Sequence, residues 1–153
     1  DIPGYRLHVV DAACGSRFYN FEKTKDGGTT WTEVNGDPFD QNMGVAEGLL
    51  FFTNDFGFAG LTYASEDFSM LYVTKDGGET FERLELPLDT VTELPSEAEE
   101  LGFTIEDYDY HTMPQIVDGK MEIYLQTDAM EQQGIIFQSA DNGVTWEYAG
   151  CKE

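Results

Sequence analysis

An eight-residue stretch, "TKDGGTTW" at residues 24–31, occurs in three versions and constrains the fold of this chain more than any other feature. It returns as "TKDGGETF" at 74–81 and as "SADNGVTW" at 139–146. In each copy Gly or Asn can supply the positive φ that tight hairpin turns require, and β-branched and aromatic residues flank the turn. The octets therefore predict three β-hairpins.

Every position of the octet has a local role in such a turn. The third residue is Asp, whose carboxylate can accept hydrogen bonds from the backbone N–H groups of the turn. The seventh residue is Thr, whose hydroxyl can tie the returning strand to the turn, and the closing aromatic ring can cover the hairpin. We therefore interpret the octet as a structural element. Its predicted structural residues are Thr24, Asp26, Gly28, Thr30, Trp31, Thr74, Asp76, Gly78, Thr80, Phe81, Ser139, Asp141, Gly143, Thr145 and Trp146.

Short apolar runs surround each octet and predict strands. They are Arg6–Ala12, Phe18–Thr24 and Thr30–Val34 in the first unit; Leu49–Thr53, Phe58–Ala64, Met70–Thr74 and Thr80–Leu84 in the second; and Met113–Val117, Met121–Thr127, Ile135–Ser139 and Thr145–Tyr148 in the third. Four-stranded antiparallel units with a period of roughly 40–50 residues are typical of β-propeller blades. We expect an all-β repeat domain over 1–153, with units at 1–36, 44–88 and 108–150, the first lacking one strand.

The octets also carry a family resemblance. Their pattern, Ser/Thr-x-Asp-x-Gly-x-Thr-Trp/Phe, resembles the Asp-box, or BNR repeat, of sialidase-like β-propellers, and Phe81 is a conservative departure from it. The stretch "LLFFTNDFGFAG" at 49–60 is similar to the inner-strand pattern of photosystem-assembly-type propellers. The resemblance implies that each octet lies on the outer part of a blade, away from the axial pocket, and specifies fold and not function.

Three units are too few to close a ring, because closed propellers have about 4–8 blades. The chain is expected to be the C-terminal part of a ring of about six or seven blades, or one of two copies that pair as half-propellers. A third alternative is a β assembly that is not a propeller. In the first two cases the open faces would expose apolar surface.

The segment 87–109 lies between the second and third units and reads as an acidic insertion. Within it, "PSEAEELG" predicts a short helix with Ser96 as N-cap, Glu99 completing a capping box and Gly102 at the C-terminal end.

The balance of charge limits the partners. The chain has 30 acidic and 8 basic residues, a formal net charge of -22. Such a surface repels nucleic acid and anionic lipid, and no apolar run approaches the ~20 residues of a membrane span. The chain begins at Asp1 without a signal segment, which we interpret as a mature or trimmed product. Cys14 and Cys151 fit one disulfide between the ends of an exported protein, or two buried thiols; the first alternative predicts an extracellular or cell-envelope location.

The resemblance also defines what a sialidase would need, including three arginines that bind the substrate carboxylate. The chain has only Arg6, Arg17 and Arg83, and Arg83 falls on a predicted outermost strand, so we exclude sialidase activity for this chain alone. A glycoside hydrolase needs only an acid and a base. The candidate carboxylates are Asp55, Asp107 and Asp109.

The most site-like stretch is "EDYDYHTM" at 106–113. Tyr108, Tyr110 and His111 alternate with acids there, a pattern that suits stacking on and hydrogen bonding to a sugar or peptide, or else packing of the insertion against its unit. No histidine or cysteine spacing indicates a metal site or a nucleophile, and no cofactor is expected. The sequence favours a non-catalytic binding or scaffolding module for a glycan or protein, partnered by upstream blades or a second copy. The alternative is the C-terminal part of a glycoside hydrolase propeller with paired carboxylates.

Overall fold

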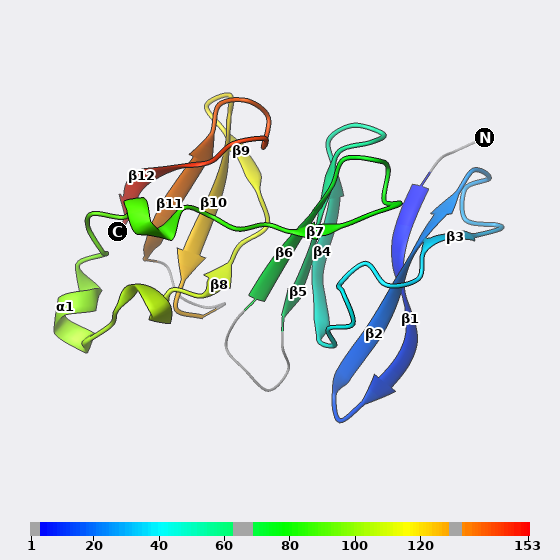
Figure 1. Ribbon diagram of the computed structural model, residues 1–153, viewed down its shortest axis with the longest axis horizontal. Coiled ribbons are helices and arrows are strands. Elements are labelled where there is room, and N and C mark those ends of the chain that lie inside the picture. Colours follow the sequence, from blue (N-terminus) through cyan, green and yellow to red (C-terminus); the bar gives the residue numbers. More distant parts are fainter. Residues whose placement is uncertain (1–3, 63–68, 129–132) are drawn as a thin grey trace. The chain divides into compact units, whose positions relative to one another are not determined.

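The computed structural model describes residues 4–62, 69–128 and 133–153 and is all-β, with 49% strand, 8% helix, three antiparallel sheets and no closed barrel (Figure 1). The described residues form two compact units. The first contains 4–62 and 70–84, and the second contains Ser69, 85–128 and 133–153.

The first sheet, drawn in blue and cyan in Figure 1, has the order β1-β2-β3. Its strands are β1 (Gly4–Ala13), β2 (Ser16–Thr24) and β3 (Thr32–Asn35). Cys14 and Gly15 form the turn between β1 and β2 with φ values of 51° and 86°. Positive φ at both central residues is the hairpin geometry that matches the twist of the strands. The predicted strands Arg6–Ala12 and Phe18–Thr24 are confirmed. The run Thr30–Val34 begins only at Thr32, because Thr30 bonds Asp26 and belongs to the turn.

The second sheet has the order β4-β5-β6-β7. Its strands are β4 (Val45–Phe51), β5 (Gly57–Thr62), β6 (Ser69–Thr74) and β7 (Glu82–Arg83). The run Phe58–Ala64 ends outside the described residues. The run Thr80–Leu84 shortens to the two residues of β7, because Thr80 bonds Asp76 and belongs to the turn.

Aromatic side chains join these two sheets within the first unit. Phe21 of β2 is fully buried, stacks on Phe51 at 5.6 Å between ring centroids and meets Phe81 edge-on at 5.4 Å. The hydroxyl of Tyr19 accepts a hydrogen bond from the N–H of Ala46 at 2.9 Å. Because side chains alternate along a strand, β2 turns Tyr19 and Phe21 toward the second sheet and the residues between them the other way.

The third sheet makes up most of the second unit, in the order β12-β11-β10-β8, with β9 also paired to β10. Its strands are β8 (Tyr110–His111), β9 (Gln115–Val117), β10 (Lys120–Gln126), β11 (Gly134–Ser139) and β12 (Glu147–Lys152). The predicted single strand Met113–Val117 is therefore wrong at its start. Pro114 separates β8 from β9, since proline has no N–H to donate to a ladder. The core residues of β10 and β11 are Met121, Ile123, Leu125, Ile135 and Phe137.

The insertion contains η1 (Leu88–Thr90), α1 (Glu97–Leu101) and η2 (Ile105–Asp107). The predicted helix is confirmed, and Gly102 ends it in the left-handed conformation with φ 74°. The capping box at Ser96 is wrong, because Ser96 itself has helical dihedral angles and its hydroxyl donates to Glu153 Oε2 at 2.7 Å. A capping box forms instead at η2, where Asp107 Oδ2 accepts from the N–H of Thr104 at 2.7 Å.

Of the helices in the described ranges, none is both long and apolar enough to cross a membrane.

Candidate functional site

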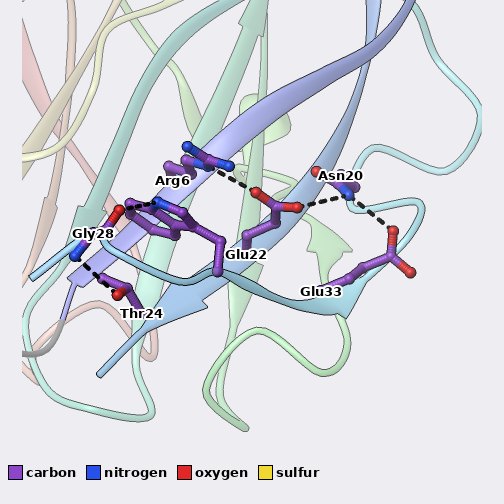
Figure 2. Close-up of polar contacts among 7 residues, drawn as sticks. Arg6, Asn20, Glu22, Thr24, Gly28 and Glu33 are labelled. Carbon is purple, nitrogen blue, oxygen red and sulfur yellow. Dashed lines mark hydrogen bonds and ion pairs between the residues drawn. The ribbon is translucent and has the colours of Figure 1, made fainter. Parts of the chain in front are cut away.

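The first octet forms a closed network of hydrogen bonds. Thr24 Oγ1 donates to Asp26 Oδ1 at 2.8 Å. The same oxygen accepts from the N–H of Gly28 at 3.0 Å (Figure 2). Asp26 also accepts from the N–H and the hydroxyl of Thr30, at 2.8 and 2.6 Å. Trp31 Nε1 donates to the carbonyl of Gly28 at 3.1 Å. The network ties both ends of the octet to the Asp26 carboxylate.

The second and third octets repeat this network. Asp76 accepts from the hydroxyl of Thr74 at 2.9 Å and from the N–H of Thr80 at 2.9 Å. Asp141 accepts from the hydroxyl of Ser139 at 2.7 Å and from the N–H of Thr145 at 2.8 Å. In both octets the Thr hydroxyl donates to the second carboxylate oxygen at 2.5 Å. Each of the three carboxylates therefore accepts bonds at both of its oxygens.

These bonds favour the ionised carboxylates. Hydrogen bonds from the hydroxyl and the N–H of Thr30 hold the pKa of Asp26 at about 2, and the same bonds from Thr145 hold the pKa of Asp141 at about 2. For Asp76, burial pushes the pKa upward, but bonds from Thr80 and Thr74 outweigh it and leave the pKa below its usual value. A carboxylate with such a pKa is a poor proton donor at neutral pH.

The second octet closes differently from the other two. Phe81 has no donor for the carbonyl of Gly78 and packs its ring against Phe21 instead. Gly78 is buried with φ 94°, and a Cβ at this position would lie 2.1 Å from a ring carbon of Phe21. This octet is thus part of the core between the first two sheets.

The face of the first sheet that points away from the second sheet is polar (Figure 2). Arg6 Nε donates to Glu22 Oε1 at 2.7 Å, and the guanidinium lies 4.1 Å from the ring centroid of Trp31. Asn20 is 5% exposed and its amide N–H group donates to Glu33 Oε1 at 2.8 Å and to Glu22 Oε2 at 3.4 Å. Alternation along β2 places Asn20 and Glu22 on this face. The apolar open face expected of a propeller part stays a prediction.

Asp55, a candidate catalytic carboxylate, lies in the turn between β4 and β5. Its N–H donates to Thr53 Oγ1 at 3.2 Å, and its carbonyl accepts from the N–H of Gly77 at 2.9 Å. Asp55 thus lies beside the second octet and belongs to the first unit, whereas Asp107 and Asp109 belong to the second. Asp107 completes the capping box of η2 by accepting from the N–H of Thr104, and the carbonyl of Asp109 accepts from the N–H of Ser69 at 3.3 Å.

Tyr108 is an interior residue. It is 1% exposed, its hydroxyl donates to Glu97 Oε1 at 3.2 Å, and its ring meets Phe103 edge-on at 6.1 Å. The prediction that Tyr108 stacks on a ligand is therefore wrong, and its ring packs the insertion as in the alternative interpretation. Tyr110 and His111 are half-buried in β8, where they pair with Gln126 and Leu125, and their role in binding stays a prediction.

Both cysteines are free thiols in the structure. Cys14 is exposed in the β1–β2 turn, and Cys151 lies in β12 with its Sγ 3.3 Å from the carbonyl oxygen of Glu93. Burial raises the pKa of Cys151, so its thiol is protonated at neutral pH. Cys14 belongs to the first unit and Cys151 to the second, so the disulfide and the extracellular location both stay predictions.

A hollow of about 560 Å³ in the first unit was not predicted from the sequence. It lies between the segment that precedes β4 and the returning end of the second octet. Its lining residues are Asn35, Asp37, Asp40, Asn42, Tyr72, Glu79, Thr80, Phe81, Glu82 and Arg83. Asp40, one of these residues, has a φ of 51°. A positive φ is uncommon in a non-glycine residue, and the sequence does not predict it at this position.

Comparison with known proteins adds no assignment: no family model, no curated protein and no solved structure matches the chain.

Proposed function

We propose that the three sheets are blades of an Asp-box β-propeller and that the chain acts as a non-catalytic module that binds a glycan or a protein or scaffolds a larger assembly. The observation that supports this most is the identical use of Asp26, Asp76 and Asp141. Each carboxylate accepts hydrogen bonds from its own turn at both oxygens. A repeated turn whose aspartate accepts hydrogen bonds from its own residues has a structural role in forming the sheets.

The same observation argues against the octets as a source of acid–base chemistry. A general acid must hold a proton near neutral pH, which requires a raised pKa, whereas the pKa of Asp26 and that of Asp141 are about 2. For the glycoside hydrolase alternative, the pair would have to come from Asp55 and Asp109, and Asp55 contributes its backbone to the second octet. No specific contact favours that alternative.

A hollow beside the second octet supports a role in binding. The hollow of about 560 Å³ is lined by the half-buried ring of Phe81 and by Asn42, whose Nδ2 is fixed by a hydrogen bond to the hydroxyl of the buried Tyr72 at 2.9 Å. Concave sites with an aromatic wall and a few fixed polar groups are typical of small-ligand and peptide recognition. The partners that complete the assembly, in this proposal, are upstream blades or a second copy.

The test combines binding and turnover. The protein is applied to an array of neutral and acidic oligosaccharides and to a peptide library, and the same sugars are assayed for hydrolysis. We expect saturable binding without turnover. Hydrolysis that is abolished by Asp55→Asn or Asp109→Asn, and retained in the turn control Asp118→Asn, would overturn the proposal in favour of a glycoside hydrolase.

A further inference from the structure

A second hollow in the first unit, of about 230 Å³, lies where β1 begins and β2 and β4 end. Its lining residues are Gly4, Tyr5, Lys23, Thr24, Lys25, Phe51, Thr53 and Asn54. These come from three segments that are distant in sequence, one of which includes Thr24 and Lys25 of the first octet. Its volume is below the roughly 300–1,000 Å³ of pockets for drug-sized ligands and suits a single ring.

One wall of this hollow is aromatic and fixed. The rings of Tyr5 and Phe51 are tilted by 45° with centroids 4.5 Å apart, and the N–H of Phe51 donates to the Tyr5 hydroxyl at 3.3 Å. Phe51 is held from behind by Phe21, which is fully buried. Tyr5 remains 40% exposed, so the wall offers an apolar surface to a ligand without needing to rearrange.

The hollow is also lined by two lysines, in a chain that has few basic residues. Lys23 and Lys25 are two of only 8 basic residues. Lys23 Nζ lies 6.0 Å from the ring centroids of both Phe21 and Phe51. Among the residues that the structure describes, the ion pair found is Arg6 with Glu22, and neither lysine has a carboxylate within 4.0 Å. Lys23 and Lys25 thus line the hollow without a salt-bridge partner among the described residues.

Polar groups complete the lining at the end of β4. Thr53 Oγ1 accepts from the N–H groups of Asp55 and Phe56, at 3.2 and 2.9 Å, which fixes the hydroxyl and leaves its own proton for donation. Asn54 adds an amide that can both donate and accept. An aromatic wall, hydroxyl and amide groups and unpaired ammonium groups together match a sugar ring that carries a carboxylate.

We propose that this hollow binds a uronate residue of an acidic glycan, with the sugar face on Tyr5 and Phe51 and its carboxylate at Lys23 and Lys25. The inference rests on the proposed function, since it names the ligand class of a glycan-binding module. Lys25 is the second residue of the first octet, and its counterparts are Lys75 in the second and Ala140 in the third. The site therefore belongs to the first octet alone, and Lys75, an exposed lysine at the same turn position, is a matched control.

The experiment measures binding of trigalacturonate, a neutral trisaccharide and benzoate by titration calorimetry. It is carried out at about 0.1 M salt, where the Debye length is about 10 Å. At this ionic strength the salt screens the long-range repulsion between the ligand and the -22 charge of the chain more than it screens a direct contact with a lysine. Lys23→Met/Lys25→Met keeps the apolar stems and removes both charges. We expect it to weaken trigalacturonate binding at least tenfold, while Lys75→Met changes the affinity less than twofold. Lys23→Met alone replaces the double variant if the latter has a lowered melting temperature.

Three results would contradict the inference in distinguishable ways. Trigalacturonate affinity that is equal in the wild type and the double variant overturns the lysine site. A neutral trisaccharide that binds as tightly as trigalacturonate overturns the uronate assignment and leaves glycan binding intact. Benzoate that binds with the same dependence on Lys23 and Lys25, when neither sugar binds, overturns both the uronate assignment and the glycan-binding function.

Discussion

The first and second octets share the residues TKDGG and the same hydrogen-bonded turn, yet they have different surroundings. Gly28 is exposed and its carbonyl accepts a bond from the Trp31 indole. Gly78 is buried against Phe21, and Phe81 packs on that ring without any donor. The Asp and Thr bonds therefore determine the shape of the turn, and the closing aromatic residue decides whether the turn stays at the surface or joins the core.

The largest expected difference between the two octets concerns their glycines. Alanine at either position must adopt a positive φ, 95° at Gly28 and 94° at Gly78, which costs about 1–3 kcal/mol. At Gly78 the new Cβ would also lie 2.1 Å from a ring carbon of Phe21, whereas at Gly28 the nearest atom is 3.6 Å away. We expect Gly78→Ala to lose about 1–3 kcal/mol more than Gly28→Ala in denaturant unfolding. Equal losses would mean that Gly78 is not packed against Phe21.

The next prediction concerns the acid of the second octet. Asp76→Ala leaves turn N–H and hydroxyl groups without an acceptor and should reduce the free energy of unfolding by about 1–3 kcal/mol. Glu100→Ala, at an exposed position of α1, serves as the control. Ligand affinity of the folded protein should not change. A loss of affinity at an unchanged melting temperature would instead make this octet functional.

A smaller effect is expected at the closing aromatic residue. Trp31→Phe gives the first octet the closing ring type of the second and removes the indole bond to the Gly28 carbonyl. The turn is exposed, so water can replace the lost donor, and we expect a loss of about 0.5–1 kcal/mol in the free energy of unfolding. A loss as large as that of Asp76→Ala would show that the ring, and not the carboxylate, holds the turn.

The smallest effect is a dependence on pH. The pKa of Asp26 and that of Asp141 are about 2, below the unfolded value of about 3.9, so folding favours their ionised forms. Their contribution to stability is complete above the unfolded pKa and is lost as the pH falls through the folded pKa. Unfolding curves of the wild type and of Asp26→Asn should therefore differ near neutral pH and converge near pH 2. A constant difference down to pH 2 would contradict the lowered pKa.

Much of the fold could be predicted from the sequence, because its signals are local. The octets predicted the hairpins, and Gly102 predicted the C-terminal end of α1. The failures involve partners distant in sequence. Ser96 bonds Glu153 instead of capping the helix, and this contact spans 57 positions. The polar face of the first sheet also depends on pairing, since Arg6 and Glu22 become neighbours only when β1 and β2 align.

The candidate sites were less predictable for the same reason. Tyr108 is of a residue type common in ligand-binding sites, and acids flank it in the sequence. Its burial beside Glu97 and Phe103 depends on how the insertion folds. The hollow at Tyr5, Lys23 and Phe51 is assembled from three segments that are distant in sequence, and the first octet supplies only Thr24 and Lys25 of its lining. The signal that was available in the sequence was the scarcity of basic residues, which makes Lys23 and Lys25 conspicuous as a close pair.

The central claim is that all three octets use their acid to build a turn, and a carboxyl carbon NMR titration tests it most directly. Selective labelling of aspartate, with Asp→Asn variants for assignment, follows Asp26, Asp76 and Asp141 between about pH 1.5 and 6, a range that spans the usual Asp pKa of about 3.9. We predict that the pKa values of Asp26 and Asp141 are about 2 and that the pKa of Asp76 also lies below its usual value. Ordinary titration of all three near pH 4 in the folded protein would contradict the claim, since carboxylates free of the Thr30, Thr80 and Thr145 bonds would behave in that way.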